Sequence, residues 1–197
     1  MATKKLRCGI DYDGVVADTS AIKAKWIRDN LGQIVAPWQT DRETCEGIIG
    51  KNEYEDLSRA VYSRPLTLAA PEVPGATYAL YQIDRLGEIY LVTARPPKRI
   101  NYAKEWLERF RLIEYFKDLV SIKDDKGHEV SKGELCQELK LDIIIDDELR
   151  YLTDKECKGL NRRILLKNGC TDRIRMPRGI EFARNWREAL DLLGIHD

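Results

Sequence analysis

The sequence predicts an α/β fold in which a parallel sheet carries helices on both faces. Short apolar segments of four or five residues recur along the chain, and amphipathic helical patterns separate them, as expected for buried parallel strands joined by crossover helices. Such crossovers are right-handed. Polar side chains directly follow several of these segments, at the edge where open parallel sheets bind ligands. The pattern is typical of a Rossmann-like domain.

Length and composition indicate a folded globular chain. The 197 residues suffice for one domain with a modest insertion. Hydrophobic residues make up 43% and charged residues 34%, which excludes a disordered chain. Lysine plus arginine and aspartate plus glutamate both number 33. The resulting net charge of zero argues against bulk attraction to nucleic acid or to an anionic membrane.

The sequence also bears on the cellular compartment. We expect no signal peptide, because acidic residues interrupt the apolar segment near the N-terminus, and no membrane partner, because no apolar run approaches the ~20 residues of a span. The five cysteines form no Cys-x-x-Cys pair, which favours reduced thiols. We therefore expect a cytoplasmic protein.

The first predicted strand contains Leu6, Cys8 and Ile10, and a helix is expected at residues 18–31. Residues 33–70 mix apolar and charged side chains without strand-like alternation, so we expect two or three short helices there. We predict that residues 18–74 form a helical cap inserted after the first strand. Residues 1–17 and 75–197 would then form the Rossmann-like core.

The rest of the chain alternates between the two patterns. Ser131 and Glu134 have the spacing of a capping box, and Asn185 has the character of an N-cap. The expected helices are 75–86, 98–111, 131–140 and 185–193, and the expected strands are 89–92, 119–122, 143–145 and 163–166.

Asp11 and Asp13 follow the first strand directly. Two carboxylates one residue apart repel each other unless a cation lies between them, and oxygen ligands suit Mg²⁺. Gly14 allows a sharp turn, which can aim backbone N–H groups at an anion such as phosphate. The alternative is structural, since acidic pairs also form turns and cap helices.

The ends of other predicted strands are polar too. Lys132 lies in the first turn of a helix, where it opposes the helix dipole and gains nothing structurally. Asp146 and Asp147 are adjacent like charges, which cost energy without a cation. The polar residues near this edge are Thr93-Ala94-Arg95 after the 89–92 strand, Lys132 on the helix that follows the 119–122 strand, and Asp146-Asp147-Glu148 after the 143–145 strand.

Several of these side chains also have ordinary structural explanations. Thr93 could be a strand-end residue without further role, and Arg95 could either reach a substrate or pair with a neighbouring acid. Trp26, Trp38 and Tyr54 could stack on a nucleobase or pack the helical lobe.

Taken in order, these motifs resemble the haloacid dehalogenase-like (HAD) phosphohydrolase superfamily over almost the whole chain. The narrower likeness is to the 5′(3′)-deoxyribonucleotidase-like branch and its bacterial nucleotidases, through Thr-Ala-Arg-Pro and Asn185-Trp186-Arg-Glu188. The four superfamily elements are Asp11-Tyr-Asp-Gly-Val-Val, Leu91-Val-Thr93-Ala-Arg, Lys132 and Ile144-Ile-Asp146-Asp147.

The resemblance implies a phosphomonoesterase that forms an aspartyl-phosphate. Asp11 would be the nucleophile, and Asp13 would protonate the leaving oxygen and then activate water. Thr93, Ala94 and Lys132 would hold the phosphate oxygens.

The resemblance also implies a Mg²⁺ cofactor. Asp11, the backbone carbonyl of Asp13, and Asp147 would bind the metal, and Asp146 would act as a further or water-mediated ligand. The sequence leaves open which of Asp146 and Asp147 touches the metal directly.

The expected partner is a small phosphorylated metabolite, with nucleoside monophosphates as the leading class by resemblance. One alternative is a phosphatase of sugar phosphates or other small metabolites. An alternative of another class is a non-catalytic binding or interaction protein with this fold. Nucleic acid is disfavoured by the charge balance, and the oligomeric state is left open.

Overall fold

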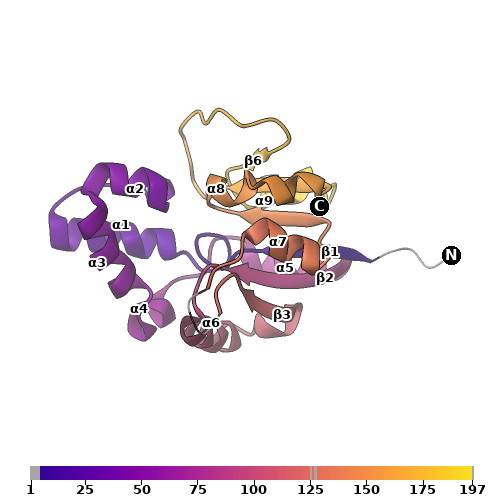
Figure 1. The fold of residues 1–197 in the computed structure, drawn as a ribbon, viewed down its shortest axis with the longest axis horizontal. Coiled ribbons are helices and arrows are strands. Elements are labelled where there is room, and N and C mark those ends of the chain that lie inside the picture. Colours follow the sequence, from indigo (N-terminus) through magenta and orange to yellow (C-terminus); the bar gives the residue numbers. More distant parts are fainter. Residues whose placement is uncertain (1–4, 125, 127, 197) are drawn as a thin grey trace.

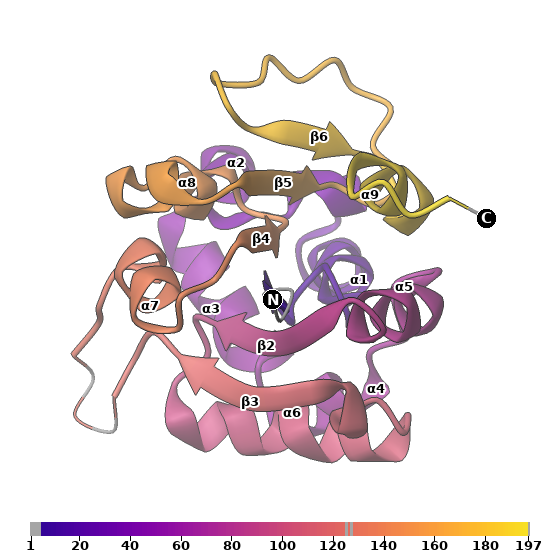
Figure 2. The same cartoon turned by 90° about the vertical axis from the view of Figure 1, so that its right-hand side faces the viewer.

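The computed structural model describes residues 5–124, 126 and 128–196. Within these residues, six parallel strands form one sheet in the order β3-β2-β1-β4-β5-β6, with helices on both faces (Figures 1 and 2). The predicted α/β fold is therefore confirmed. The strands are β1 Leu6–Ile10, β2 Gly87–Thr93, β3 Phe116–Ser121, β4 Ile143–Asp146, β5 Arg162–Leu166 and β6 Glu181–Ala183.

The central strand β1 lies between β2 and β4, and its register sets the position of the polar strand ends. Ile10, its last residue, pairs with Leu91 of β2 and with Ile145 of β4. Because the strands are parallel, the residues that follow these three positions meet at one edge of the sheet. That edge faces helices α1 (Thr19–Leu31), α2 (Arg42–Ile49), α3 (Lys51–Val61) and α4 (Arg64–Ala69) (Figure 1).

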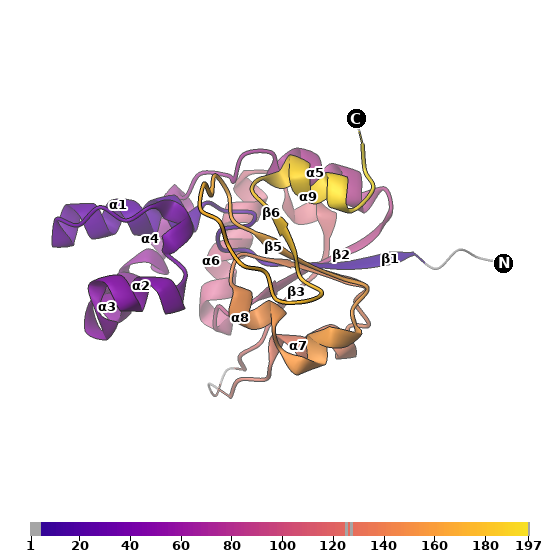
Figure 3. The ribbon, with the colours of Figure 1, turned by 90° about the horizontal axis from the view of Figure 1, so that it is seen from above.

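Helices cover each face of the sheet through a separate apolar cluster. On one face, Leu80, Trp106 and Leu190 belong to a cluster built by α5, α6 and α9, and on the other Leu135 and Leu152 come from α7 and α8. Figure 3 shows α5 and α9 on one side of the strands and α7 and α8 on the other. The helices are α5 Ala76–Asp84, α6 Pro97–Arg109, α7 Lys132–Glu138, α8 Leu149–Leu152 and α9 Trp186–Leu192.

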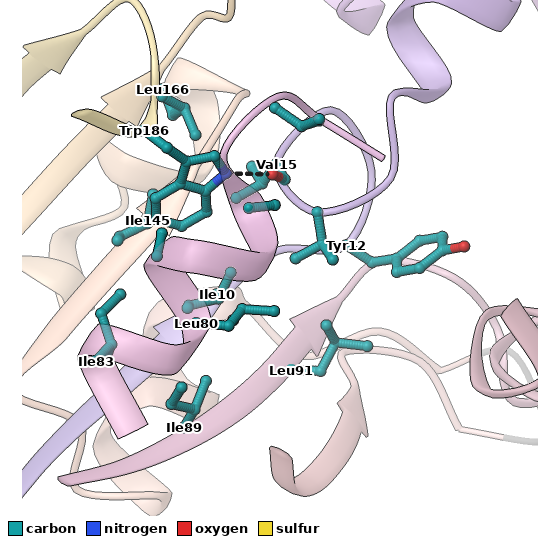
Figure 4. Packing of buried hydrophobic residues seen from close by; sticks show 14 of the residues in the cluster. Ile10, Tyr12, Val15, Leu80, Ile83, Ile89, Leu91, Ile145, Leu166 and Trp186 are labelled. Carbon is teal, nitrogen blue, oxygen red and sulfur yellow. Dashed lines mark hydrogen bonds between the residues drawn. The ribbon is translucent and has the colours of Figure 1, made fainter. Parts of the chain in front are cut away.

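Trp186 anchors the loop that follows β1. Its buried indole packs among Ile145 and Leu166 (Figure 4). The indole Nε1 donates a hydrogen bond of 2.9 Å to the Val15 carbonyl. A buried carbonyl needs such a partner, so the contact fixes the loop between Asp11 and α1 against the core.

The first helices form a layer beyond the carboxyl ends of the strands, called here the helical layer (residues 19–69). It has an apolar cluster of its own, which includes Ile27, Cys45 and Leu57. Asp18 caps its first helix by accepting a hydrogen bond from Ala21 N. Its helices are α1 Thr19–Leu31, α2 Arg42–Ile49, α3 Lys51–Val61 and α4 Arg64–Ala69, with a 3₁₀ turn at Pro37–Gln39.

The structure corrects the predicted elements in a few places. Strand β6 and the single-turn helix α8 were not predicted, because three and four residues are too short for a periodic signal. Strand β3 starts at Phe116 rather than at 119, since exposed Lys117 and Asp118 hide its apolar character. No described helix has both the length and the apolar character that a membrane span requires.

Candidate active site

Three buried carboxylates gather at the carboxyl edge of the sheet. Asp11 follows β1, and Asp146 and Asp147 lie at the end of β4. Each side chain offers an oxygen, and these oxygens all lie within 4.8 Å of one another. The backbone holds this arrangement, because Asp11 N donates to the Ile145 carbonyl at 3.0 Å and continues the strand pairing.

Lys132 neutralises part of this cluster. Its ammonium lies 2.7 Å from Asp11 Oδ1 and 2.5 Å from Asp146 Oδ2, with almost no solvent exposure. Burial alone would lower the pKa of Lys132, but the two carboxylates hold it well above its ordinary value. The predicted capping box at Ser131 and Glu134 is present and sets the start of α7, which places Lys132 in its first turn.

Asp11 is held by its own loop as well as by Lys132. Its Oδ2 accepts a hydrogen bond of 2.8 Å from Asp13 N. Burial raises the pKa of Asp11 to about 7, Asp146 and Asp13 add to this rise, and the charge of Lys132 offsets part of it.

Gly14 is required at the turn after Asp13. It has a φ of 73°, in the region that side chains disfavour. A Cβ at this position would also run into the carboxylate of Asp147. The turn and the close approach of Asp147 therefore both depend on glycine.

Asp13 pairs with Arg95, which the sequence left open between a substrate and a neighbouring acid. The guanidinium Nε and Nη2 lie 2.8 and 2.7 Å from the two oxygens of Asp13. A third nitrogen donates to Thr67 Oγ1 at 2.8 Å, and the group lies between the rings of Tyr12 and Tyr62, 4.7 and 4.9 Å from their centroids. Burial would raise the pKa of Asp13, but Arg95 outweighs it and the pKa falls below its ordinary value.

Asp146 and Asp147 differ in their hydrogen bonds. One oxygen of Asp146 accepts from Lys132 and the other from Glu148 N at 2.8 Å. The carboxylate of Asp147 has no hydrogen bond or ion pair with the described residues, although its residue is only 7% exposed. Burial raises the pKa of Asp147 well above its ordinary value, nearby carboxylates add to the rise, and Lys167 offsets part of it.

The remaining predicted residues also lie at this edge. Thr93 is fully buried, and its hydroxyl accepts a hydrogen bond of 3.2 Å from Arg95 N. Ala94 lines a cavity above Asp11 and Asp147. The structure therefore brings every predicted site residue to one edge of the sheet. Thr93 and Lys132 do not line the cavity and instead contact neighbouring residues.

The helical layer closes the cavity from the other side and supplies a cation that the sequence reasoning missed. Lys23 of α1, Tyr54 and Tyr62 line the cavity opposite Asp11 and Asp13. The sequence does contain a sign that Lys23 is buried, because it lies four residues after Thr19 and four before Ile27, which are both buried. A lysine at that spacing is on the buried face of the helix.

Of the three aromatic residues singled out in the helical layer, Tyr54 alone lines this cavity. Trp26 packs against the apolar cluster of the layer. The indole of Trp38 donates to Asp172 Oδ2 at 2.8 Å.

The chain is similar to known proteins in sequence and in fold. A curated relative from Oceanobacillus iheyensis, described as "Putative nucleotidase OB0422", is 31% identical over 147 residues, 72% of this chain and 69% of that protein. A haloacid dehalogenase-like hydrolase from Streptococcus pneumoniae matches with a TM-score of 0.60 at 13% identity, over 96% of this chain and 98% of that chain. The HAD-hydrolase YfnB from Bacillus subtilis, described as bound to magnesium, matches with a TM-score of 0.61 at 14% identity, over 98% of this chain and 100% of that chain. No family model matches.

The fold is that of haloacid dehalogenase-like hydrolases. The chain belongs to the family of the curated relative described as a nucleotidase. The resemblance seen in the four sequence motifs is thereby confirmed, including the likeness to a nucleotidase.

Proposed function

We propose that this chain is a Mg²⁺-dependent phosphomonoesterase that hydrolyses nucleoside monophosphates through an aspartyl-phosphate on Asp11. The observation that carries the chemistry is the buried cluster in which Lys132 bridges Asp11 and Asp146 while Asp147 is left without a partner. The nucleotide substrate is supported by the relative described as a nucleotidase.

The carboxylates fit a divalent cation. An unpartnered buried carboxylate is costly, and Asp147 is such a group beside the charged Asp11. We assign Asp11, the backbone carbonyl of Asp13 and Asp147 as direct ligands. Of the two adjacent aspartates, Asp147 is chosen because its carboxylate has no hydrogen bond with the described residues, and Asp146, which Lys132 and Glu148 N hold, is the outer partner. Bound Mg²⁺ would neutralise charge on the phosphate.

Asp11 would attack the phosphorus, and the bond from phosphorus to the leaving oxygen would break as the new bond forms. Lys132 orients the nucleophile and offers positive charge to the phosphate, with Thr93 and Ala94 beside it. Water would then attack the phosphorus and release Asp11 as a carboxylate.

Asp13 would protonate the leaving oxygen in the first step and take a proton from water in the second. Its pairing with Arg95 favours the charged form, which suits the base role. To act as an acid, Asp13 must be protonated, so the bound substrate would have to raise its pKa against the effect of Arg95.

Residues 18–74 would act as a cap that excludes water from the site and selects the substrate. The position of Lys23, Tyr54 and Tyr62 in the cavity lining supports this role. Tyr54 and Tyr62 are the aromatic side chains of this layer that are available to a nucleobase.

The test is phosphate release from a panel of nucleoside monophosphates and sugar phosphates, with Mg²⁺ and with a chelator. We expect Mg²⁺-dependent release concentrated on nucleotides, and loss of at least 10³-fold in the Asp11→Asn variant with an unchanged circular dichroism spectrum. Release concentrated on sugar phosphates would refute the nucleotide assignment. Substantial turnover by Asp11→Asn would refute the nucleophile assignment.

A further inference from the structure

The cavity above the carboxylates has all of its acidic lining on one side, where four cations also lie, whereas the charged groups on its other side are cations. Its acidic residues, among them Asp11, Asp13 and Asp147, all come from the strand ends and the residues just after them. The lining from the helical layer carries Lys23 and Arg42 and no carboxylate. A volume of about 180 Å³ leaves room for roughly ten water molecules, more than one phosphate group fills.

Most cations around this cavity already have an acidic partner. Arg95 pairs with Asp13, and Arg42 pairs with Glu46 at 2.7 Å. Lys123 and Arg150 likewise pair, with Glu129 at 3.2 Å and Glu148 at 2.5 Å. These pairs leave little charge free for a ligand.

Lys23 is the first exception. It is 2% exposed, and its ammonium donates a hydrogen bond of 3.3 Å to the Thr40 carbonyl. It forms no ion pair with the described residues, so two of its three donors lack an oxygen acceptor. Burying an ammonium in this way is unfavourable unless a further anion reaches it.

Arg99 is the second exception, and it faces the same part of the cavity. Its guanidinium forms no ion pair with the described residues and lies 5.8 Å from the centroid of the Tyr62 ring. The Lys23 ammonium lies 5.7 Å from that same centroid. Tyr62 therefore has two cations without an ion pair beside one ring, which strengthens the positive potential there.

We propose that the substrate carries a second anionic group, a phosphate or a carboxylate, on its leaving-group side, and that Lys23 and Arg99 bind it. The inference rests on the proposed phosphatase activity and adds a substrate class to it. Within the proposed nucleotide class, a nucleotide with a second phosphate would engage both cations, so we expect it to be preferred over a nucleoside monophosphate, which is still hydrolysed.

The position of Lys23 separates it from the transferred phosphate. Lys132 approaches that phosphate from α7, on the Asp11 and Asp146 side. Lys23 instead comes from the helical layer and lines the cavity together with Asp13, whereas Lys132 does not line it. Because Asp13 would protonate the leaving oxygen, the leaving group extends toward Lys23.

The test compares kcat/KM within two matched pairs of substrates. The first pair is 2′-deoxyadenosine 5′-monophosphate and 2′-deoxyadenosine 3′,5′-bisphosphate, and the second is glycerol 3-phosphate and 3-phosphoglycerate. We expect at least a tenfold preference for the member with the second anion in one pair. Preference in the first pair identifies a second phosphate, and preference in the second identifies a carboxylate.

Lys23→Met and Arg99→Met should each reduce that preference at least fivefold, and Arg99→Met serves as the variant outside the core should Lys23→Met fail to fold. Lys25→Met is the matched control, because Lys25 lies on the same helix, is exposed, and pairs with Asp29; it should leave the preference unchanged.

Equal loss on both members of a pair in the variants, or no preference in the wild type despite phosphate release, would overturn this inference alone. Absence of release from every substrate, including the monophosphates, would overturn the proposed function as well.

Discussion

Replacing Arg95 with methionine should destabilise the protein more than the loss of an exposed ion pair does. Arg95 is almost fully buried and holds both oxygens of Asp13. It also joins Asp13 to the helical layer through Thr67 and the Tyr62 ring. The variant therefore leaves a buried carboxylate uncompensated and loosens the contact between the sheet edge and α4.

The magnitude follows from the burial of the pair. Removing one partner of a buried ion pair costs about 3–5 kcal/mol. The side chain of Asp13 is 14% exposed, so water reaches it partly and the lower half of this range applies. Loss of the contacts with two aromatic rings adds about 1 kcal/mol. For a chain of this length, the melting temperature should fall by roughly 10 °C.

The dependence on pH has a definite sign. In the wild type the pKa of Asp13 is depressed by Arg95, so the pair stabilises the fold above the ordinary aspartate pKa of ~3.9 and loses this effect as the pH falls through the depressed value. In the variant, burial still raises the pKa of Asp13, and Lys23 opposes this rise without the help of Arg95. The difference in unfolding free energy between the wild type and Arg95→Met should therefore be largest at neutral pH and become smaller as the pH falls.

Urea denaturation at several pH values measures this gap. The control is Arg64→Met, because Arg64 of α4 pairs with Glu105 of α6 while their side chains are 56% and 41% exposed, and such pairs are worth about 0–1 kcal/mol. Asp13→Asn combined with Arg95→Met should recover part of the loss. Equal destabilisation by Arg95→Met and Arg64→Met, or a gap that widens in acid, would refute the reasoning.

Three further predictions concern other parts of the molecule. Asp41→Asn keeps the N-cap of α2 but loses the buried pair with Lys167 at 2.8 Å. Because the pKa of Asp41 is depressed, we expect a loss of about 3 kcal/mol in urea denaturation at neutral pH that narrows below about pH 4 and disappears only below the depressed pKa. Trp186→Phe leaves the buried Val15 carbonyl unpaired and should cost about 1–3 kcal/mol in thermal unfolding and reduce phosphate release. Asp147→Asn should weaken Mg²⁺ binding at least tenfold in titration calorimetry.

Each of these has a matched comparison. Asp29→Asn removes an exposed acid that pairs with Lys25, and a loss as large as that of Asp41→Asn would contradict the burial argument. Trp38→Phe removes an indole hydrogen bond near the surface and should cost less than Trp186→Phe. Thr93→Ala should affect Mg²⁺ binding less than Asp147→Asn does. The reverse order would show that the metal site is assigned to the wrong residues.

The sequence predicts the sheet and the gathering of its polar strand ends because these depend on local periodicity. Apolar runs with helical patterns between them give parallel strands, and parallel strands bring Asp11, Thr93 and Asp146 to one edge. The capping box at Ser131 likewise needs only residues three apart. These features are encoded within short windows, so the chain reveals them without its tertiary structure.

The tertiary structure decides which of the clustered side chains touch. Arg95 and Asp13 are 82 residues apart in sequence, and nothing local distinguishes this pair from an arginine that reaches a substrate. The difference between Asp146 and Asp147 depends on Lys132 and Glu148 occupying both oxygens of Asp146.

The same holds for the burial of Lys23, which requires the helical layer to fold over the sheet edge. Helical spacing places Lys23 on the buried face of α1, but only the packed structure shows that this face turns a charge toward the cavity. Periodicity determines which face of an element is buried. The partner of each buried charge is set by distances between segments far apart in the chain, because electrostatic interactions depend on separation in space rather than in sequence.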